Sequence, residues 1–130
     1  MHFQKFEHYG LLLMGELATG EFSHPCSLAQ ISSHHGVSVP FFKKIVRKLR
    51  TAGLVRSKEG VGGGYMLARN PSSITMWEII AALGDGAAGP DRTATACPVN
   101  ASCLPQHIRG RLSERIRTLL STISLKEVAQ

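Results

Sequence analysis

Apolar residues recur every three or four positions in the first third of the chain, a spacing that predicts helices. The first helix is expected over about residues 3–18 and ends before a glycine. A second, short helix is expected to run from Ser27 to about His35, because Ser27 and Gln30 have the spacing of a capping box. Gly36 then breaks the helix.

A third helix begins two residues after this break. Ser38 can cap it, and Pro40 is tolerated in the first turn, where the missing N–H costs nothing. Its buried stripe is predicted to be Phe42, Ile45, Val46 and Leu49. The opposite face is predicted to carry Lys43, Lys44, Arg47 and Lys48. Two helices joined by a tight turn, the second basic on its outer face, form a helix-turn-helix.

Residues 54–67 alternate between apolar and polar on both sides of a glycine cluster at 60–64. This pattern is typical of a two-stranded hairpin with a flexible tip, or wing. No Lys-Ser or Lys-Thr pair follows the cluster, and a strand comes next, so a phosphate-binding nucleotide loop is disfavoured. The glycines are expected to let the tip turn and approach a DNA backbone.

The second half of the chain begins with another capping box, from Thr75 to Glu78. Its helix is expected to end near Leu83 and to bury Trp77, Ile80 and Leu83. Residues 84–96 are small, polar and unpatterned and predict a loop. A long helix follows over about residues 105–123, and Ser124 caps a last helical turn. The apolar stripe of the long helix is Ile108, Leu112, Ile116, Leu119 and Ile123.

The predicted fold is therefore mainly α with a small β-hairpin wing: a winged helix-turn-helix followed by a long C-terminal dimerisation helix. We expect a DNA-binding domain at 1–83, a sensor loop at 84–104, and the dimerisation helix with the C-terminal helix at 105–130. The stripe of the long helix is narrow, which suits packing against a second copy. The alternative is that this helix folds back on its own domain.

Composition narrows the function. The 130 residues carry a formal charge of +6, and seven of the fifteen Lys and Arg residues lie between positions 43 and 58, with no acidic residue among those sixteen positions. Such a density suits nucleic acid. No nucleophile–base pair or paired carboxylates indicate an enzyme. The chain lacks a membrane-spanning stretch or an export signal, so a cytoplasmic location is expected, and three cysteines do not suggest a disulfide framework.

The segments "SLAQISSHHGVSVPFFKKIVRKLRTAGLVRSKEGVGGGYMLAR" and "ITMWEIIAAL" resemble the Rrf family of bacterial winged-helix regulators, best known for the IscR and NsrR iron-sulfur sensors. The similarity extends to "LSERIRTLLSTISLKEVA" near the C-terminus. It implies a cytoplasmic homodimer whose basic helices enter neighbouring major grooves of a palindromic operator. The wings would approach the minor groove, and the long helix would form the dimer interface.

The expected DNA-binding residues lie at the start and outer face of the third helix and in the wing. They are Ser38, Pro40, Phe41, Lys43, Lys44, Arg47, Lys58, Gly62 and Gly63. One position departs from the family: relatives often have an arginine just before the glycine cluster, where this chain has Glu59. Phosphates repel a carboxylate, so wing contact is expected to depend on Lys58 or Arg56.

The resemblance also implies a metal centre before the long helix. Cluster-binding members carry three cysteines there, and this chain has the last two, Cys97 and Cys103, with Asp91 at the place of the first. A minority of the family completes the site with histidine and carboxylate. By position, the predicted ligands are Cys97, Cys103, His107 and His8, with Glu7 and Asp91 in reserve.

Three kinds of chemistry are compatible with this segment. A [2Fe-2S] cluster is favoured, and histidine ligation would raise its reduction potential. Zinc accepts two thiolates and two imidazoles, but five residues between the cysteines is a looser spacing than usual. Without metal, the cysteines form a reversible thiol switch or are inert. The sequence thus predicts a repressor controlled by a cluster or thiol state; the alternative is a cluster-free thiol switch or an adaptor for a protein partner.

Overall fold

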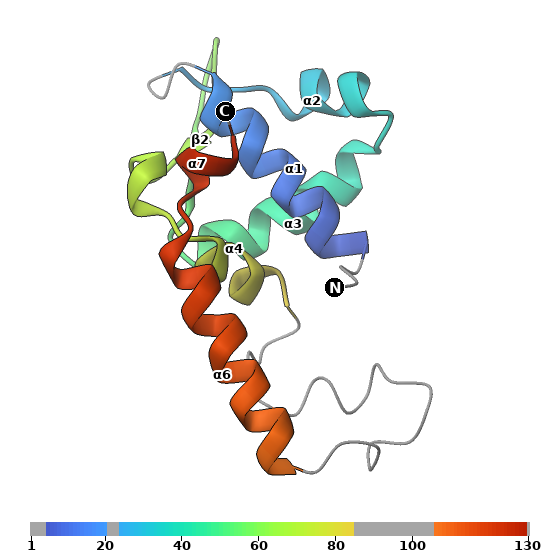
Figure 1. The fold of residues 1–130 in the computed structure, drawn as a ribbon. Coiled ribbons are helices and arrows are strands. Elements are labelled where there is room, and N and C mark those ends of the chain that lie inside the picture. Colours follow the sequence, from blue (N-terminus) through green and yellow to red (C-terminus); the bar gives the residue numbers. More distant parts are fainter. Residues whose placement is uncertain (1–4, 21–23, 85–105, 130) are drawn as a thin grey trace.

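The computed structural model describes residues 5–20, 24–84 and 106–129, apart from the side chains of residues 106, 107 and 109. The helices and strands follow in the order α1 (Lys5–Thr19), α2 (Leu28–His35), α3 (Val39–Thr51), β1 (Val55–Lys58), β2 (Gly64–Leu67), the 3-10 helix η1 (Pro71–Ser73), α4 (Met76–Leu83), α6 (Gln106–Thr122) and α7 (Leu125–Val128). The helices α1 to α4 and the hairpin form one body, and α6 extends away from it (Figure 1). The mainly helical fold with a hairpin wing is confirmed.

The core joins helices that are far apart in the sequence. Leu13 of α1, Ile45 of α3 and Ile79 of α4 have no exposed surface. Burying such a side chain is worth roughly 1.5–3 kcal/mol, so the contacts of α1 with α3 and α4 hold the body together. The C-terminal helix α7 returns to this core, where its Leu125 is 1% exposed.

The helix-turn-helix forms as predicted. Gly36 ends α2 with a φ of +65°, a left-handed conformation that favours glycine. Ser38 precedes α3, and Pro40 lies in its first turn. The cap of α2 differs in detail from the prediction: the Ser27 hydroxyl accepts from the Ala29 N–H in place of the expected box with Gln30. The four predicted buried residues of α3 are all buried.

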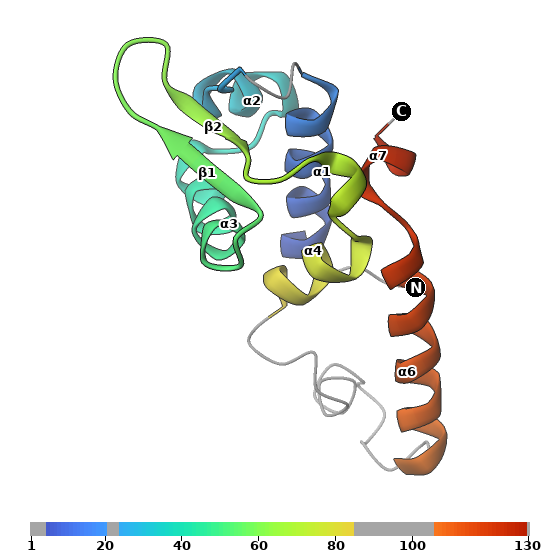
Figure 2. The same cartoon turned by 90° about the vertical axis from the view of Figure 1, so that its left-hand side faces the viewer.

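The hairpin pairs β1 and β2 antiparallel, from Val55 opposite Leu67 to Lys58 opposite Gly64. Two backbone hydrogen bonds of 2.8 Å between Cys26 and Tyr65 attach it to the segment before α2. The wing is therefore attached directly to the helix-turn-helix. The tip points away from α6, as Figure 2 shows.

Two of the three residues predicted to be buried on α4 are only partly buried. Ile79 and Leu83 are buried, whereas Trp77 and Ile80 are only half-buried. The Trp77 ring instead lies 5.7 Å from the guanidinium of Arg117 on α6. Nearly all of α4 is apolar, and it contacts α1, α3 and α6, so its neighbours set the buried face.

The exit of α6 is fixed to the body by a short antiparallel pairing. The Met76 N–H donates to the carbonyl of Ile123 at 2.9 Å, and the Leu125 N–H donates to that of Ile74 at 2.8 Å. Capping boxes at Thr75 and Ser124 begin α4 and α7 on either side of this pairing, as predicted. None of the helices in the described ranges is long and apolar enough to cross a bilayer.

Candidate nucleic-acid interface

The outer face of α3 is a basic surface. Lys43, Lys44, Arg47 and Arg50 are exposed, and α3 contains no acidic residue. At 3.6 residues per turn, Arg47 lies near the middle of this face. The buried stripe on the opposite side holds the helix against α1 and α4, so the four basic side chains project from a fixed support.

Two grooves flank this face. On the wing side, a groove of about 530 Å³ is lined by Lys43, Arg47, Arg50 and Tyr65 of β2, among others. On the other side, a groove of about 1040 Å³ toward α1 and α4 includes Lys44, and again Arg47. Arg47 therefore borders both grooves.

Lys48 does not belong to the outer face, which corrects the prediction. It is half-buried, and its Nζ donates to the Leu83 carbonyl at 3.3 Å. The same ammonium lies 4.8 Å from the centre of the Phe6 ring. It joins α3 to α4 and α1, because it extends along the side of α3 that packs on them.

The three DNA-binding residues predicted at the start of α3 differ in their exposure. Ser38 and Pro40 are exposed, and the Ser38 side chain makes no capping hydrogen bond. Phe41 is half-buried, with its ring 5.6 Å from those of Phe6 and Tyr9 in edge-on geometry. The contacts of Phe41 are thus packing contacts with α1.

The backbone of the wing tip requires glycine at several positions, because of its φ angles or because a side chain would not fit. Gly60 and Gly62 have φ values of +94° and +73°, where a side chain would be strained. A Cβ on Gly63 would collide with the carbonyl of Lys58. The tip is exposed, including the whole side chain of Val61. Lys58, exposed at the end of β1, is the basic residue next to it.

The predicted metal ligands mostly lie outside the described residues. This holds for Cys97, Cys103, Asp91 and the side chain of His107. His8 is exposed on α1 beside Tyr9, with 5.2 Å between the ring centres. Its imidazole is therefore accessible from outside the chain.

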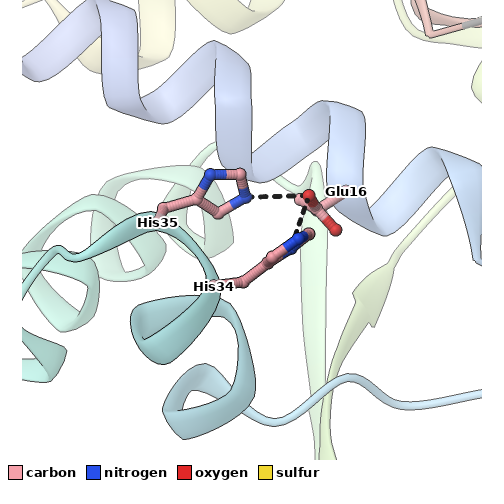
Figure 3. A group of neighbouring side chains, drawn as sticks. All are labelled: Glu16, His34 and His35. Atoms are coloured by element: carbon pink, nitrogen blue, oxygen red, sulfur yellow. Dashed lines mark hydrogen bonds and ion pairs between the residues drawn. The ribbon is translucent and has the colours of Figure 1, made fainter.

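The structure also brings together a cluster that the sequence analysis missed. Glu16 of α1 contacts both His34 and His35, the last residues of α2 (Figure 3). The Oε1 of Glu16 is 2.8 Å from Nε2 of His35 and 3.5 Å from Nδ1 of His34. Eighteen positions separate Glu16 from His34, so no local pattern signals the contact.

A fixed basic helix beside a hairpin defines a winged helix-turn-helix protein of the DNA-binding class. The chain belongs to the Rrf2 family, described as iron-dependent transcriptional regulators, whose model matches residues 3–130. It is thus a transcription regulator similar to IscR and not an enzyme.

Individual relatives agree with this assignment. The HTH-type transcriptional regulator IscR of Klebsiella pneumoniae is 33% identical over 121 residues, which cover 92% of this chain and 74% of that protein. The solved structure of CymR, the global cysteine regulator of B. subtilis, has a TM-score of 0.76 and 29% identity and covers 99% of this chain and 96% of its own. That of T. potens IscR has a TM-score of 0.76 and 28% identity, with coverages of 98% and 85%.

Proposed function

We propose that this protein is a cytoplasmic, homodimeric repressor that binds a palindromic double-stranded DNA operator. The basic face of α3 enters the major groove, and the wing lies along the neighbouring backbone. The observation that carries the proposal is the acid-free exposed face of α3, centred on Arg47 and bordered by the groove toward Tyr65.

The side chains suit two kinds of contact. Arg47 and Lys43 bind base edges, since an arginine or lysine matches the O6 and N7 acceptors of guanine. Lys44, Lys58 and the helix start at Ser38 bind phosphates, because the N–H groups at a helix N-terminus favour an anion and the Ser38 side chain does not cap them. Pro40 lies against the backbone, and Gly62 and Gly63 let the wing approach it closely.

Two copies are needed because one short helix contacts few bases. The exposed apolar residues of α6, Ile108, Leu112 and Leu119, are 44%, 53% and 61% exposed in one chain. Their helical spacing places them on one side, which is the pattern of an interhelical contact. We assign this side of α6 to the dimer interface. The proposed organisation is then a DNA-binding domain at 1–83, a sensor loop at 84–104 and a dimerisation segment at 105–130.

DNA binding is tested with Arg47→Glu on duplexes selected in vitro from a random pool. Reversing the charge at the centre of the basic face removes a base contact and repels the neighbouring phosphates, so it weakens binding more than tenfold at every salt concentration, while the affinity of the wild type falls as salt rises. Fluorescence anisotropy measures both quantities. Lys126→Glu, the same reversal of charge at an exposed position of α7, is the matched control and keeps wild-type affinity.

Two outcomes contradict the proposal. One is an Arg47→Glu variant that binds as tightly as wild type. The other is binding that does not change with salt, because an adaptor for a protein partner releases no DNA counterions.

The proposed control centre is a [2Fe-2S] cluster held by Cys97, Cys103 and His107, with His8 contributed by the second protomer. The family's description as iron-dependent and the exposure of His8 on α1 support this assignment. Two thiolates and two imidazoles fit an iron-sulfur centre that cycles between redox states. In the sequence, Cys97 and Cys103 fall between the DNA-binding body and α6, so the proposal is that the state of the centre biases the angle between the two half-sites.

Iron, acid-labile sulfide and the visible spectrum of anaerobically purified protein test the centre. Cys97→Ser and Cys103→Ser abolish the colour and the iron, whereas Cys26→Ser, which changes the cysteine beside Tyr65, retains both. Colourless protein whose operator affinity responds to oxidant through Cys97 and Cys103 identifies the thiol switch instead. Stoichiometric zinc without iron identifies the zinc alternative.

A further inference from the structure

The cluster of Glu16, His34 and His35 lies between α1 and the end of α2 and shares no residue with the proposed iron-sulfur ligands (Figure 3). One ligand atom of each residue lies within 4.8 Å of the other two. The side chains of Glu16 and His35 are 32% and 21% exposed, and that of His34 is 72% exposed. The cluster is thus half-enclosed and open to solvent on the His34 side.

These three donors match a particular class of metal ion. Two imidazoles and one carboxylate form a common zinc set, in which a water molecule takes the fourth position. Ligand atoms about 2.1 Å from a tetrahedral ion are about 3.4 Å apart. Glu16 Oε1 is 3.5 Å from His34 Nδ1 and 2.8 Å from His35 Nε2, and all three ligand atoms lie within 4.8 Å of one another, so side-chain rotations produce the required spacing.

The position on the helix also favours a cation. His34 and His35 lie in the last turn of α2, where unpaired carbonyls give the helix end a partial negative charge. The open side at His34 leaves room for a water ligand. Adjacent residues of a regular helix point in different directions, but here both imidazoles reach the same carboxylate oxygen.

We propose that Glu16, His34 and His35 bind a divalent transition metal ion, with Zn²⁺ the best match. Nδ1 of His34, Nε2 of His35 and the Glu16 carboxylate are the ligands, and water completes the tetrahedron. The ion joins α1 to the first helix of the helix-turn-helix and so stabilises the support of α3. This site is separate from the proposed cluster and does not depend on DNA binding.

Cobalt(II) and zinc titrations of the full chain with Cys97→Ser and Cys103→Ser test the site. Removing both thiolates separates it from the proposed cluster, so failure of one proposal is distinguishable from failure of the other. We expect one Co²⁺ per chain with a visible d–d spectrum and no thiolate charge-transfer band, displaced by Zn²⁺. Bound Zn²⁺ also raises the melting temperature, because it binds only the folded state.

Two variants in the same background locate the ligands. His35→Gln and Glu16→Gln each weaken Zn²⁺ binding by roughly 100-fold or more, since loss of a second-shell partner alone costs about 10–100-fold. His24→Gln, which changes a histidine outside the cluster, is the matched control and leaves the affinity unchanged. Circular dichroism confirms that each variant is folded.

Should Glu16→Gln fail to fold, His34→Gln replaces it, because that side chain is largely exposed. The proposal is overturned if the chain with Cys97→Ser and Cys103→Ser binds no Co²⁺ or Zn²⁺, or if His34→Gln and His35→Gln bind Zn²⁺ as tightly as their parent. The three side chains would then form only a hydrogen-bonded contact between α1 and α2.

Discussion

Glu78 shows how one side chain can begin a helix and join it to a neighbour. Its Oε2 accepts from the Thr75 N–H at 2.9 Å, and its Oε1 accepts from the Arg69 guanidinium at 2.7 Å. Burial by itself would raise the pKa of Glu78, but the Thr75 backbone bond and Arg69 together bring it below the ordinary value of 4.5. The ionised form is therefore favoured in the folded state.

Replacing Glu78 by Gln tests this contribution. A carboxyl whose pKa is lower in the folded state stabilises the fold at any pH above its pKa in the unfolded state. That stabilisation is lost as the pH falls through its pKa in the folded state. Glu78→Gln is thus expected to lower the free energy of unfolding by about 0.5–1 kcal/mol at pH 7, a figure that allows for the side chain's partial exposure. The difference from wild type shrinks from about pH 4.5 downward.

Urea unfolding of both proteins from pH 3 to pH 7 measures the difference. Glu59→Gln, at the exposed wing tip, is the control for loss of one negative charge. If the free energy of unfolding of Glu78→Gln is lower than that of wild type by the same amount at every pH, the shape of the side chain, and not its ionisation, causes the loss of stability.

At the scale of elements, the wing depends on a close approach between β2 and the segment before α2. A Cβ on Gly64 would overlap the carbonyl of Cys26, whose neighbouring bonds to Tyr65 hold the hairpin. The periodic pattern of residues 54–67 predicts the hairpin but not its attachment. Pairing with a residue some forty positions earlier has no local signal.

Gly64→Ala is therefore expected to destabilise the protein by about 1–3 kcal/mol, as for other overpacked sites. Gly15→Ala is the matched control: a Cβ there meets nothing within 4 Å, and it lies inside α1. The control should stabilise the protein by about 0.5–1 kcal/mol, because alanine loses less entropy in a helix. Denaturant unfolding compares them, and equal effects of the two substitutions would contradict the packing argument.

At the scale of the whole molecule, the proposed dimer depends on α6, which would hold the two copies of α3 on one operator. The proposal places its exposed apolar side against a second copy, so Leu112→Glu would bury a charge in the interface. Dissociation to monomers at micromolar concentration is expected, together with a loss of operator affinity. Analytical ultracentrifugation measures the mass in solution.

Thr118→Glu provides the control, because it introduces the same side chain on the same helix. Residue 118 lies roughly 120° around the helix axis from Leu112, and it is exposed. It is expected to leave the dimer intact. A wild-type protein that is monomeric at micromolar concentration would remove both the dimer and the palindromic operator from the proposal.

The sequence by itself determined the features that depend on near neighbours. The caps at Thr75 and Ser124, the break at Gly36, the buried stripe of α3 and the presence of the hairpin all follow from residue type and spacing. These features are local, since helix and strand periods and turn chemistry operate over a few positions.

Only the tertiary structure decided the contacts between distant segments. It turned Lys48 from the basic face toward Leu83, set the buried side of the almost wholly apolar α4, and brought His34 and His35 to Glu16. Each outcome depends on which helices pack together and at what angle. Packing is set by the sum of all core contacts, so no short stretch of sequence carries that information.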